Sequence, residues 1–507
     1  MYASPVKKLD ASIEAQNPTP KLKFIKSVIY REGLSWICKM VELSLYSYGP
    51  RTSVEYGGGT FDVGPDVFIA VEGVGTFEGV SVERKIQSLL LAGKDPAKTA
   101  AKVHRESTQR GHASITTSLS FQLEVRECSR ALSMLLVAPP FGSYLQESQR
   151  RASITHSSLK TPPFTSKHHI KIFEETAHRL VDGYKQLIEN GVTLEDARYV
   201  LPLCTKTSLF ISCSLETYVS FIQHSNLGEY LPHEVSEFAE KFYSLAKNVA
   251  PMMVEARLMV KHPLVSYPFP NPFKPSDPFF TKILEGKNFD EPLLLHLQNL
   301  LPDKLFHDVF AANVKELVDT VNPLINAVTL EPLSLVAYHQ AIRHRTVPTA
   351  VESIYAAAER ALKSPERNII PPPDVKTNPR NMKLFAELCG EALECYHRLI
   401  EDGCRLGDAA LILPQALKVY VVRAYNGFNL LYPSGFVATR TCSYAQWEER
   451  AIAYKVLHEV VKRAPELETV MGEKCRQLGY CPEKTWCPII LKYHKYSDEL
   501  HQRMQRS

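Results

Sequence analysis

A short basic motif in the second half of the chain carries the residues best suited to chemistry. His339 and Gln340 precede Arg343-His344-Arg345, and the motif follows an apolar run. Arginine offers a planar fork of donors for phosphate or carboxylate, and histidine donates or accepts near neutral pH. The motif therefore suits a planar anion such as a nucleotide. A bare Arg-His-Arg is more often a solvated basic turn, so other motifs have to decide between these interpretations.

An internal repeat is visible without knowledge of any family. Residues 187–202 align with residues 399–414 without a gap. A repeat at this spacing indicates a duplicated domain, because the units of a solenoid are much shorter. Each copy reads as a helix ended by glycine, followed by a second helical segment broken at Leu-Pro. Two upstream aromatic pairs match as well: Phe173 with Phe385, and Tyr184 with Tyr396.

The basic motif resembles the signature of the flavin-dependent thymidylate synthases, H-Q-x-x-R-H-R-x-x-S-x-N-E-x-S-x-R-Y. Residues 339–345 match its beginning in the second copy, and beyond them only Ser353 matches. The first copy keeps the end of the signature, including Ser148 and Arg150, whereas Ala138-Pro139-Pro140 replaces its Arg-His-Arg. The two copies therefore keep complementary parts of one signature.

Two further family motifs are divided between the copies in the same way. The pattern A-R-x-x-L-P contains Arg198 in the first copy, and Ala410 takes its place in the second. The pattern R-x-x-x-x-A-Q-x-E-[IL]-R occurs only in the second copy, at residues 440–450, and is the most specific match in the chain. The signature Asn and Glu are absent from both copies, and Tyr444 replaces the His before A-Q.

The resemblance implies a role for each matching residue. The residues implied to bind dUMP are Gln340, Arg343, Ser148, Arg150 and Arg198. Arg440 is implied to be catalytic. The residues implied to lie against the flavin are His344, Arg345, His112 and Ser114. Arg150 and Arg198 also lie beside carboxylates in the sequence, where surface ion pairs are an alternative explanation.

The activity implied is reductive methylation of dUMP to dTMP by reduced FAD and methylenetetrahydrofolate, with NADPH restoring the flavin. This chemistry needs no protein nucleophile. Family sites are assembled from several subunits of a homotetramer, so a homodimer of this duplicated chain would mimic that tetramer and combine both halves in one site. Two alternatives stay open. One is a non-catalytic paralogue that acts as a nucleotide-binding or assembly module, and the other is a flavoenzyme for another nucleotide.

The resemblance implies an α+β fold, with two tandem copies of the flavin-dependent thymidylate synthase fold, each an antiparallel sheet with long helices. We expect the following parts: an N-terminal extension (1–39), a first domain (40–265), a Pro-rich linker (266–280) and a second domain (281–507). The Pro-rich stretch cannot continue a helix, which marks the junction.

Periodicity predicts the elements that position these motifs. We expect a strand at 40–47 with sheet-like character continuing through 67–71, and a second strand at 121–125. Gly57-Gly58-Gly59 is better explained as a hairpin turn than as a dinucleotide loop. Helices are expected over 84–110 and 232–261, and near 291–327, where they replace the glycine-rich strands of the first copy.

Composition limits the classes of function. With 507 residues, 45% hydrophobic residues and a net charge of +4, the chain is typical of a globular protein with an anionic small ligand, not of a nucleic-acid binder. No apolar run suggests a membrane span or a signal peptide, so a cytoplasmic location is expected. The eleven cysteines read as reduced thiols. Cys475, Cys481, Cys487 and His494 match no standard zinc spacing, so no metal is expected.

Overall fold

The computed structural model describes residues 41–150, 153–224, 228–260, 269–301 and 317–506. A single compact unit spans Lys39–Ser507. The predicted N-terminal extension (1–39) lies outside the described residues, and so do residues 261–268 at the predicted domain junction. None of the helices in the described part of the chain is both long and apolar enough to span a membrane.

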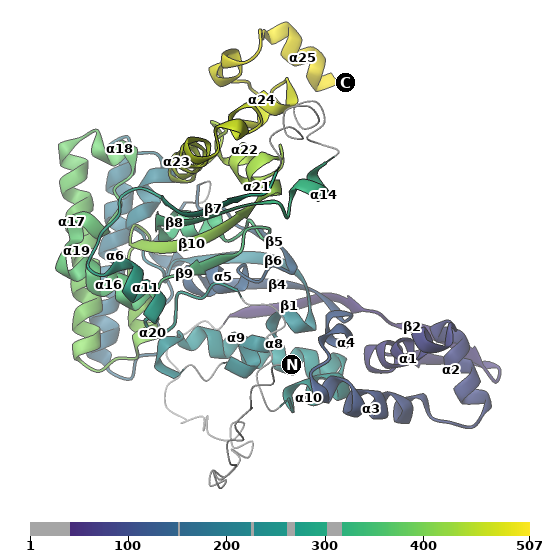
Figure 1. Ribbon diagram of the computed structural model, residues 1–507. Coiled ribbons are helices and arrows are strands. Elements are labelled where there is room, and N and C mark those ends of the chain that lie inside the picture. The colour runs from purple at the N-terminus through teal and green to yellow at the C-terminus, as the bar shows by residue number, and fades with distance from the viewer. Residues whose placement is uncertain (1–40, 151–152, 225–227, 261–268, 302–316, 507) are drawn as a thin grey trace, which may run out of the picture. The chain divides into compact units, whose positions relative to one another are not determined.

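Alternating apolar residues build an antiparallel four-stranded sheet in the first copy (Figure 1). In order across the sheet, its strands are β1 (Glu42–Gly49), β4 (Ser120–Ser129), β6 (Lys206–Ser214) and β5 (Gly142–Gln146). In β4, the side chains of Phe121, Leu123 and Val125 are buried and alternate with more exposed neighbours, as expected for a strand with one covered face. The strands predicted at 40–47 and 121–125 are confirmed.

The second copy repeats this sheet with the same strand order and the same antiparallel pairing. In order across the sheet, its strands are β7 (Leu293–Asn299), β8 (Ile325–Ser334), β10 (Lys418–Asn426) and β9 (Thr349–Val351). The prediction of helices near 291–327 is wrong for β7, an edge strand in the position that β1 holds in the first sheet. Its run of leucines does not alternate, so periodicity could not separate strand from helix. Helix α14 (Val318–Val321) lies in the same stretch.

Two long helices of equal length accompany the two sheets. Helix α6 (Lys167–Glu189) and helix α19 (Pro379–Glu401) each have 23 residues and pack against each other (Figure 1). A Cβ atom at Gly183 would lie 2.3 Å from Leu388 Cδ1, so the glycine allows the helices to approach closely. Equal helix lengths and equal strand orders support the duplication predicted from the repeat.

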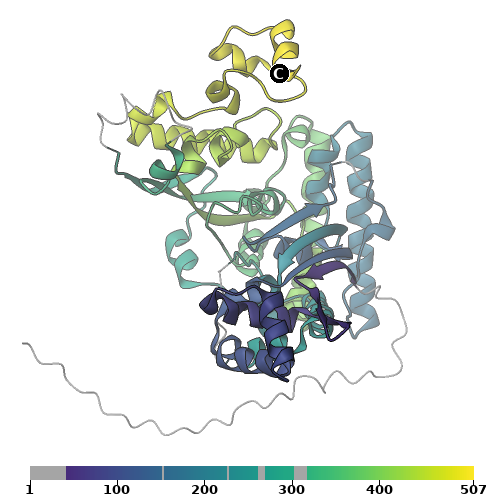
Figure 2. The ribbon, with the colours of Figure 1, turned by 90° about the vertical axis from the view of Figure 1, so that its right-hand side faces the viewer.

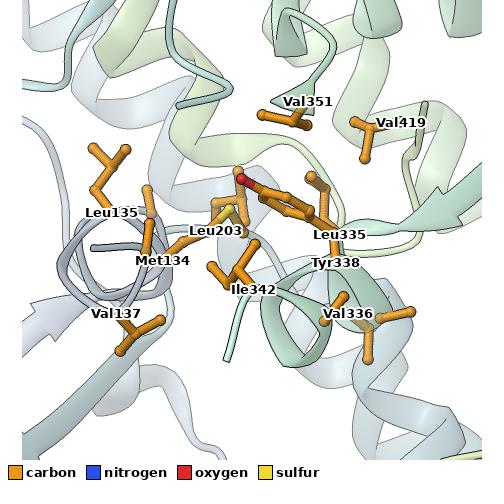
Figure 3. Close-up of a cluster of buried hydrophobic side chains, with 14 of the residues drawn as sticks. Met134, Leu135, Val137, Leu203, Leu335, Val336, Tyr338, Ile342, Val351 and Val419 are labelled. Carbon is orange, nitrogen blue, oxygen red and sulfur yellow. The ribbon is translucent and has the colours of Figure 1, made fainter. Parts of the chain in front are cut away.

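One continuous hydrophobic core joins the two copies. It includes α5 (Arg130–Leu136) and α15 (Leu335–Ala341), short helices at matching positions after β4 and β8. Figure 3 shows buried side chains from both helices in one cluster, among them Leu135 of α5 and Tyr338 of α15. The two copies therefore fold around shared apolar side chains.

Backbone hydrogen bonds also cross between the copies, and they do so reciprocally. Leu203 N donates to Leu413 O at 3.1 Å. At the matching positions of the repeat, Gln415 N donates to Leu201 O at 3.0 Å. This exchange is what a local twofold relation between the two copies produces, because each copy makes the same contact to the other.

The front of the first copy contains a helical region that the sequence only partly predicted. A hairpin is formed by β2 (Thr52–Tyr56) and β3 (Gly59–Val63). Its turn lies at Gly57 and Gly58, whose φ angles of 60° and 79° favour glycine, as predicted. Residues 67–71, expected to continue the sheet, lie instead in α1 (Pro65–Glu78). A short apolar run does not distinguish a buried helix from a strand, whereas Pro65 at the first helical turn favours a helix.

The two longer predicted helices are helical in the structure, but each is divided into two helices. The stretch 84–110 contains most of α2 (Val82–Leu91) and all of α3 (Pro96–Glu106). The stretch 232–261 contains α9 (His233–Val249) and α10 (Pro251–Leu258). Pro251 has no backbone N–H and cannot continue α9, so the helix ends before it.

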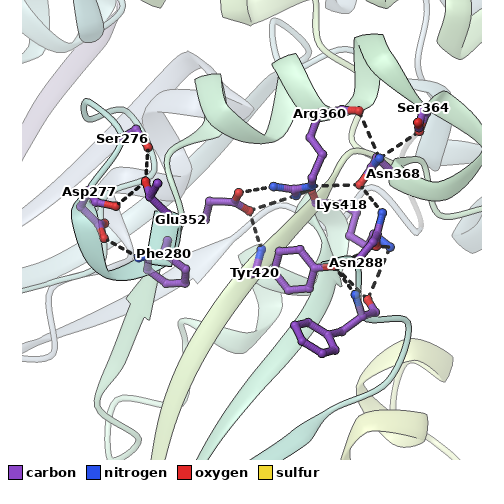
Figure 4. Close-up of polar contacts among 12 residues, drawn as sticks. Ser276, Asp277, Phe280, Asn288, Glu352, Arg360, Ser364, Asn368, Lys418 and Tyr420 are labelled. Atoms are coloured by element: carbon purple, nitrogen blue, oxygen red, sulfur yellow. Dashed lines mark hydrogen bonds and ion pairs between the residues drawn. The ribbon is translucent and has the colours of Figure 1, made fainter. Parts of the chain in front are cut away.

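The segment that follows the predicted junction is fixed to the second sheet. Helix α11 (Pro278–Leu284) begins within the predicted linker. Beyond it, Asn288 accepts a hydrogen bond from Lys418 Nζ at 2.6 Å. Figure 4 shows this contact together with the ion pair between Arg360 and Glu352, which lies on the same side of the sheet. Polar contacts therefore hold the beginning of the second copy against β10.

Candidate functional site

Five arginines from the two copies gather in one place, which we call the arginine cluster. Its members are Arg130, Arg150 and Arg198 from the first copy, and Arg343 and Arg440 from the second. The surrounding protein lowers the pKa of Arg343, and the charges of Arg440, Arg150 and Arg198 lower it further. The structure thus brings together the arginines that the sequence assigned to dUMP and to catalysis.

The ends of regular elements position these side chains. Arg130 is the first residue of α5, directly after β4, and Arg150 follows β5. Arg198 begins a 3-10 turn that comes after α6. Arg343 follows α15, and Arg440 is the last residue of a short helix. The convergence of these ends from two copies creates a site that neither copy has by itself.

The cluster has a buried side and an open side, because Arg150 and Arg343 are exposed and Arg440 is half-buried. Arg130 and Arg198 are only 5% and 4% exposed. Burial, followed by the charges of Arg343 and Arg198, lowers the pKa of Arg130 to about 9. Guanidinium groups stay protonated in proteins, so this shift expresses the cost of burying the charge and, second, of holding like charges together. A bound anion would offset that cost, so the cluster suits an anionic ligand.

Several buried polar atoms in or next to the cluster have no hydrogen-bond partner within the described part of the chain. They are Arg130 Nε, Arg198 Nη2, Gln340 Nε2, both side-chain amide atoms of Gln149 and both ring nitrogens of His339. Leaving such an atom unpaired costs about 1–3 kcal/mol, and native proteins contain few of them. Their concentration here indicates a ligand that offers both donors and acceptors, as a nucleotide does.

The environment of the two histidines of the basic motif favours their neutral form. Burial, followed by the charges of nearby arginines, holds the pKa of both His339 and His344 well below the usual value. Arg440 Nε donates to His344 Nε2 at 2.6 Å, which requires that this ring nitrogen be unprotonated. His344 therefore fixes the direction of the Arg440 guanidinium.

Two contacts connect the basic motif to the other copy. Arg343 donates a hydrogen bond to the side-chain oxygen of Gln146, which stands where the family signature has Glu. The guanidinium of Arg345 lies over the ring of Tyr144, 5.6 Å from its centre. Both partners belong to β5, so the beginning of the signature in the second copy meets its end in the first.

Arg150 and Arg198 also make the ion pairs that the sequence offered as an alternative explanation for them. Both approach Glu195 Oε1, at 3.6 Å and 3.7 Å. These distances are longer than a hydrogen bond, so the carboxylate leaves most of the donors of the two arginines available. Ser148 lies beside them, and its hydroxyl accepts from Arg150 N at 3.3 Å.

His112 and Ser114 lie away from the arginine cluster within one chain. Both are exposed. They lie in or next to α4 (Ala113–Thr117), which precedes the first residue of β4. Arg130 follows the last residue of the same strand. Ten residues of strand separate them, a length of about 30 Å. The role of His112 and Ser114 at the flavin stays a prediction.

The specific match at 440–450 has a structural role beside the cluster. Glu448 lies at the start of α23 (Trp447–Arg463) and accepts from Ser334 Oγ at 2.7 Å and from Tyr199 OH at 2.8 Å. Gln446 donates to the same Tyr199 hydroxyl at 2.7 Å. Because Ser334 caps α15, this network fixes the helix that leads into the basic motif. Burial raises the pKa of Glu448 to about 7.

Sequence reasoning missed three members of this neighbourhood. Arg130 is part of a Ser-Arg pair directly after a predicted strand, a signal that was present but assigned no role. His339 and Gln149 lie within the two signature halves, next to residues that were selected. Their burial without partners could not be read from spacing, because it depends on how the copies pack.

Comparison with known proteins identifies the family. The model of the family described as "Thymidylate synthase complementing protein" matches residues 77–252 and 326–466. These two segments cover more than half of the chain, and they fall on the two copies. The chain belongs to this family, and the resemblance and the duplicated fold predicted from its sequence are confirmed.

Individual relatives carry the name flavin-dependent thymidylate synthase. The protein from Thermococcus onnurineus is 33% identical over 168 residues, which are 31% of this chain and 65% of that protein. The protein from Pyrococcus horikoshii is 35% identical over 169 residues, 32% of this chain and 66% of that one. The chain thus spans less than two thirds of the length of these relatives. A solved structure of the UMP/dUMP methylase PolB from Streptomyces cacaoi is 15% identical with a TM-score of 0.31, covering 43% of this chain and 95% of that one.

Proposed function

We propose that this chain is an FAD-dependent thymidylate synthase, which methylates dUMP to dTMP with methylenetetrahydrofolate and NADPH. Its site would combine the two domains, residues 40–265 and 281–507. The observation that supports this most strongly is the arginine cluster, where arginines of both copies lie close enough to lower one another's pKa. Membership of the family and the names of the relatives support the choice of reaction.

The side chains of the cluster suit the two charged parts of dUMP. Arg150, Arg198 and Arg343 would bind the phosphate, since guanidinium donors pair well with phosphate oxygens. Arg440 would stabilise negative charge that develops on the uracil ring, and its contact with the neutral His344 holds it in one direction before substrate arrives. Gln340 and Ser148 would add hydrogen bonds to the nucleotide.

The donors next to the cluster also fit a flavin. Arg345 has an exposed guanidinium that can pair with the FAD pyrophosphate, and His344 offers a neutral ring. FAD, when bound, would supply the reducing equivalents for methyl transfer. Leu145 and Gln146 replace the Asn and Glu of the family signature, which favours a non-catalytic, nucleotide-binding paralogue as the second candidate.

The separation between His112 and the arginine cluster has a direct consequence for assembly. If His112 and Ser114 serve the flavin, they would serve the site of a second chain in a homodimer. Co-expression of chains carrying Arg343→Ala with chains carrying His112→Ala tests this. A mixed dimer would regain one intact site, so random pairing restores about a quarter of the wild-type activity. If His112 acts within its own chain, no activity returns.

The visible absorption spectrum of the purified protein tests the proposal. We expect a flavin band after FAD is added, a shift of that band when dUMP is added, and dTMP formation when methylenetetrahydrofolate and NADPH are present. The Arg343→Ala variant should keep the band and lose the dUMP-dependent shift. A protein that binds dUMP but never FAD would favour the paralogue, and one that binds neither would contradict the proposal.

A further inference from the structure

Four cysteines line one small cavity near the C-terminal end of the described chain. They are Cys442, Cys475, Cys481 and Cys487. The cavity measures about 20 Å³, enough for a single water-sized body. No disulfide joins these cysteines, which are free.

The segment around this cavity lacks an apolar core of its own. Within residues 474–506 only Cys481, Ile490 and His501 are buried. The segment consists of three short helical elements: α24 (Lys474–Leu478), η8 (Pro488–Lys492) and α25 (Asp498–Arg506). Hydrogen bonds such as that from Tyr493 OH to Glu473 at 2.7 Å hold this segment, and a bound metal would add the stability that an apolar core does not supply here.

We propose that Cys442, Cys475, Cys481 and Cys487 bind one structural zinc ion. Zinc prefers four ligands in a tetrahedron, and four thiolates make a closed structural site. On binding, the four S–H bonds break, four Zn–S bonds form, and the four protons pass to water. No group of three or more His, Cys, Asp or Glu side chains in the described residues is placed to hold a metal ion as it stands, so the proposal requires the four thiol side chains to turn towards the cavity when the ion binds.

This inference departs from the expectation of no metal. Sequence spacing suggested Cys475, Cys481, Cys487 and His494, which match no known pattern, but His494 instead contacts Arg476 O at 3.2 Å and does not line the cavity. Cys442 takes its place from a distant part of the sequence. Because Cys442 lies two residues after Arg440, the ion would also fix the loop that carries the predicted catalytic arginine to the C-terminal segment.

The metal content of the full-length protein, purified under reducing conditions and reconstituted with zinc, tests the proposal. We expect about one tightly bound zinc per chain. Replacement by cobalt should give the intense thiolate-to-cobalt absorption of a tetrahedral site, a readout that needs no variant. Cys487→Ser should lose the metal, whereas the control Cys404→Ser, which changes a cysteine outside the cavity, should keep it. Absence of bound metal, retention of zinc by Cys487→Ser, or disulfides between these cysteines in the purified protein would overturn the proposal.

Discussion

The internal repeat places a second location at the positions equivalent to the arginine cluster. Its side chains are uncharged and buried, whereas those of the cluster are charged. The repeat assigns an uncharged, mainly hydrophobic residue to three arginines of the cluster and to two glutamines beside them: Ala138 for Arg343, Tyr355 for Arg150, Ala410 for Arg198, Leu135 for Gln340 and Val351 for Gln146. We call these five residues the apolar twin. All are less than 10% exposed, and Figure 3 shows Leu135 and Val351 within one cluster of buried side chains. One location keeps charge, and the other has become part of the core.

Residues of the predicted linker contact the segment next to the apolar twin. Ser353, which matches Ser148 of the cluster, donates its hydroxyl hydrogen to Lys274 O at 2.7 Å. The next residue, Ile354, donates its N–H to Pro272 O at 2.9 Å. A residue type that the signature uses for the nucleotide thus anchors the linker here. The polar atoms of one location thus stay available, whereas the twin is packed into the core and tied to residues 272–274.

The comparison predicts that a charge introduced into the apolar twin destabilises the protein and does not create a second nucleotide site. Ala410→Arg would place a charge at a position that is 0% exposed and surrounded by core. An uncompensated buried charge of this kind destabilises a protein by about 3–5 kcal/mol, so the urea midpoint of the variant should fall sharply. A variant as stable as wild type that binds a second dUMP would break the comparison.

Removing an arginine from either half of the cluster should weaken dUMP binding. We expect Arg343→Ala and Arg198→Ala each to reduce affinity by about a hundredfold or more, since loss of one partner of a buried charged contact costs about 2–5 kcal/mol. Isothermal titration calorimetry with dUMP measures this. Tyr355→Phe, at the twin of Arg150, is the matched control and should bind normally. Unchanged affinity in either arginine variant would rule out a shared site.

Acid should lower the free energy of unfolding through the two histidines next to the arginine cluster, and the apolar twin should make no such contribution. The pKa of His339 and of His344 is lower in the folded chain than in the unfolded chain, so the unfolded state binds more protons below about pH 6.5. Their contribution to stability is complete above that pH and is lost as the pH falls, by up to about 1.4 kcal/mol per pH unit for each ring. The twin of His339 is Met134, which does not titrate.

His339→Met should therefore reduce the loss of unfolding free energy between about pH 7.5 and about pH 5.5. Urea denaturation at both pH values gives this difference. Met134→Leu at the twin position supplies the control, because it changes no titratable group and should leave the pH dependence as it is in wild type. A His339→Met variant with the wild-type pH dependence would show that the ring is not held neutral.

The two matching serines should give the smallest and most selective effects. Ser353→Ala removes a buried hydrogen bond and should lower the unfolding free energy by about 1 kcal/mol without changing dUMP affinity. Ser148→Ala should do the reverse, weakening dUMP about fivefold with little change in stability. Urea denaturation and calorimetric titration with dUMP, carried out on both variants, measure the two effects. Equal effects of the two substitutions would mean that the two locations are not specialised.

The sequence predicted the duplication, the family and most members of the cluster, because these depend on residue identity and spacing. It placed Arg198 and Arg343 in one site from complementary motifs. It could not predict that Arg130 lies among them or that Gln146 contacts Arg343, since both depend on how two copies pack. It also misread β7 and α1, where short apolar runs give no period.

The stoichiometry of dUMP binding tests the central claim most directly. Equilibrium dialysis of the full chain with labelled dUMP, in the presence of FAD, counts the sites without any substitution. One composite site per chain predicts saturation at about one dUMP per chain. Saturation at about two would contradict the account, because it would show that the apolar twin also binds the nucleotide.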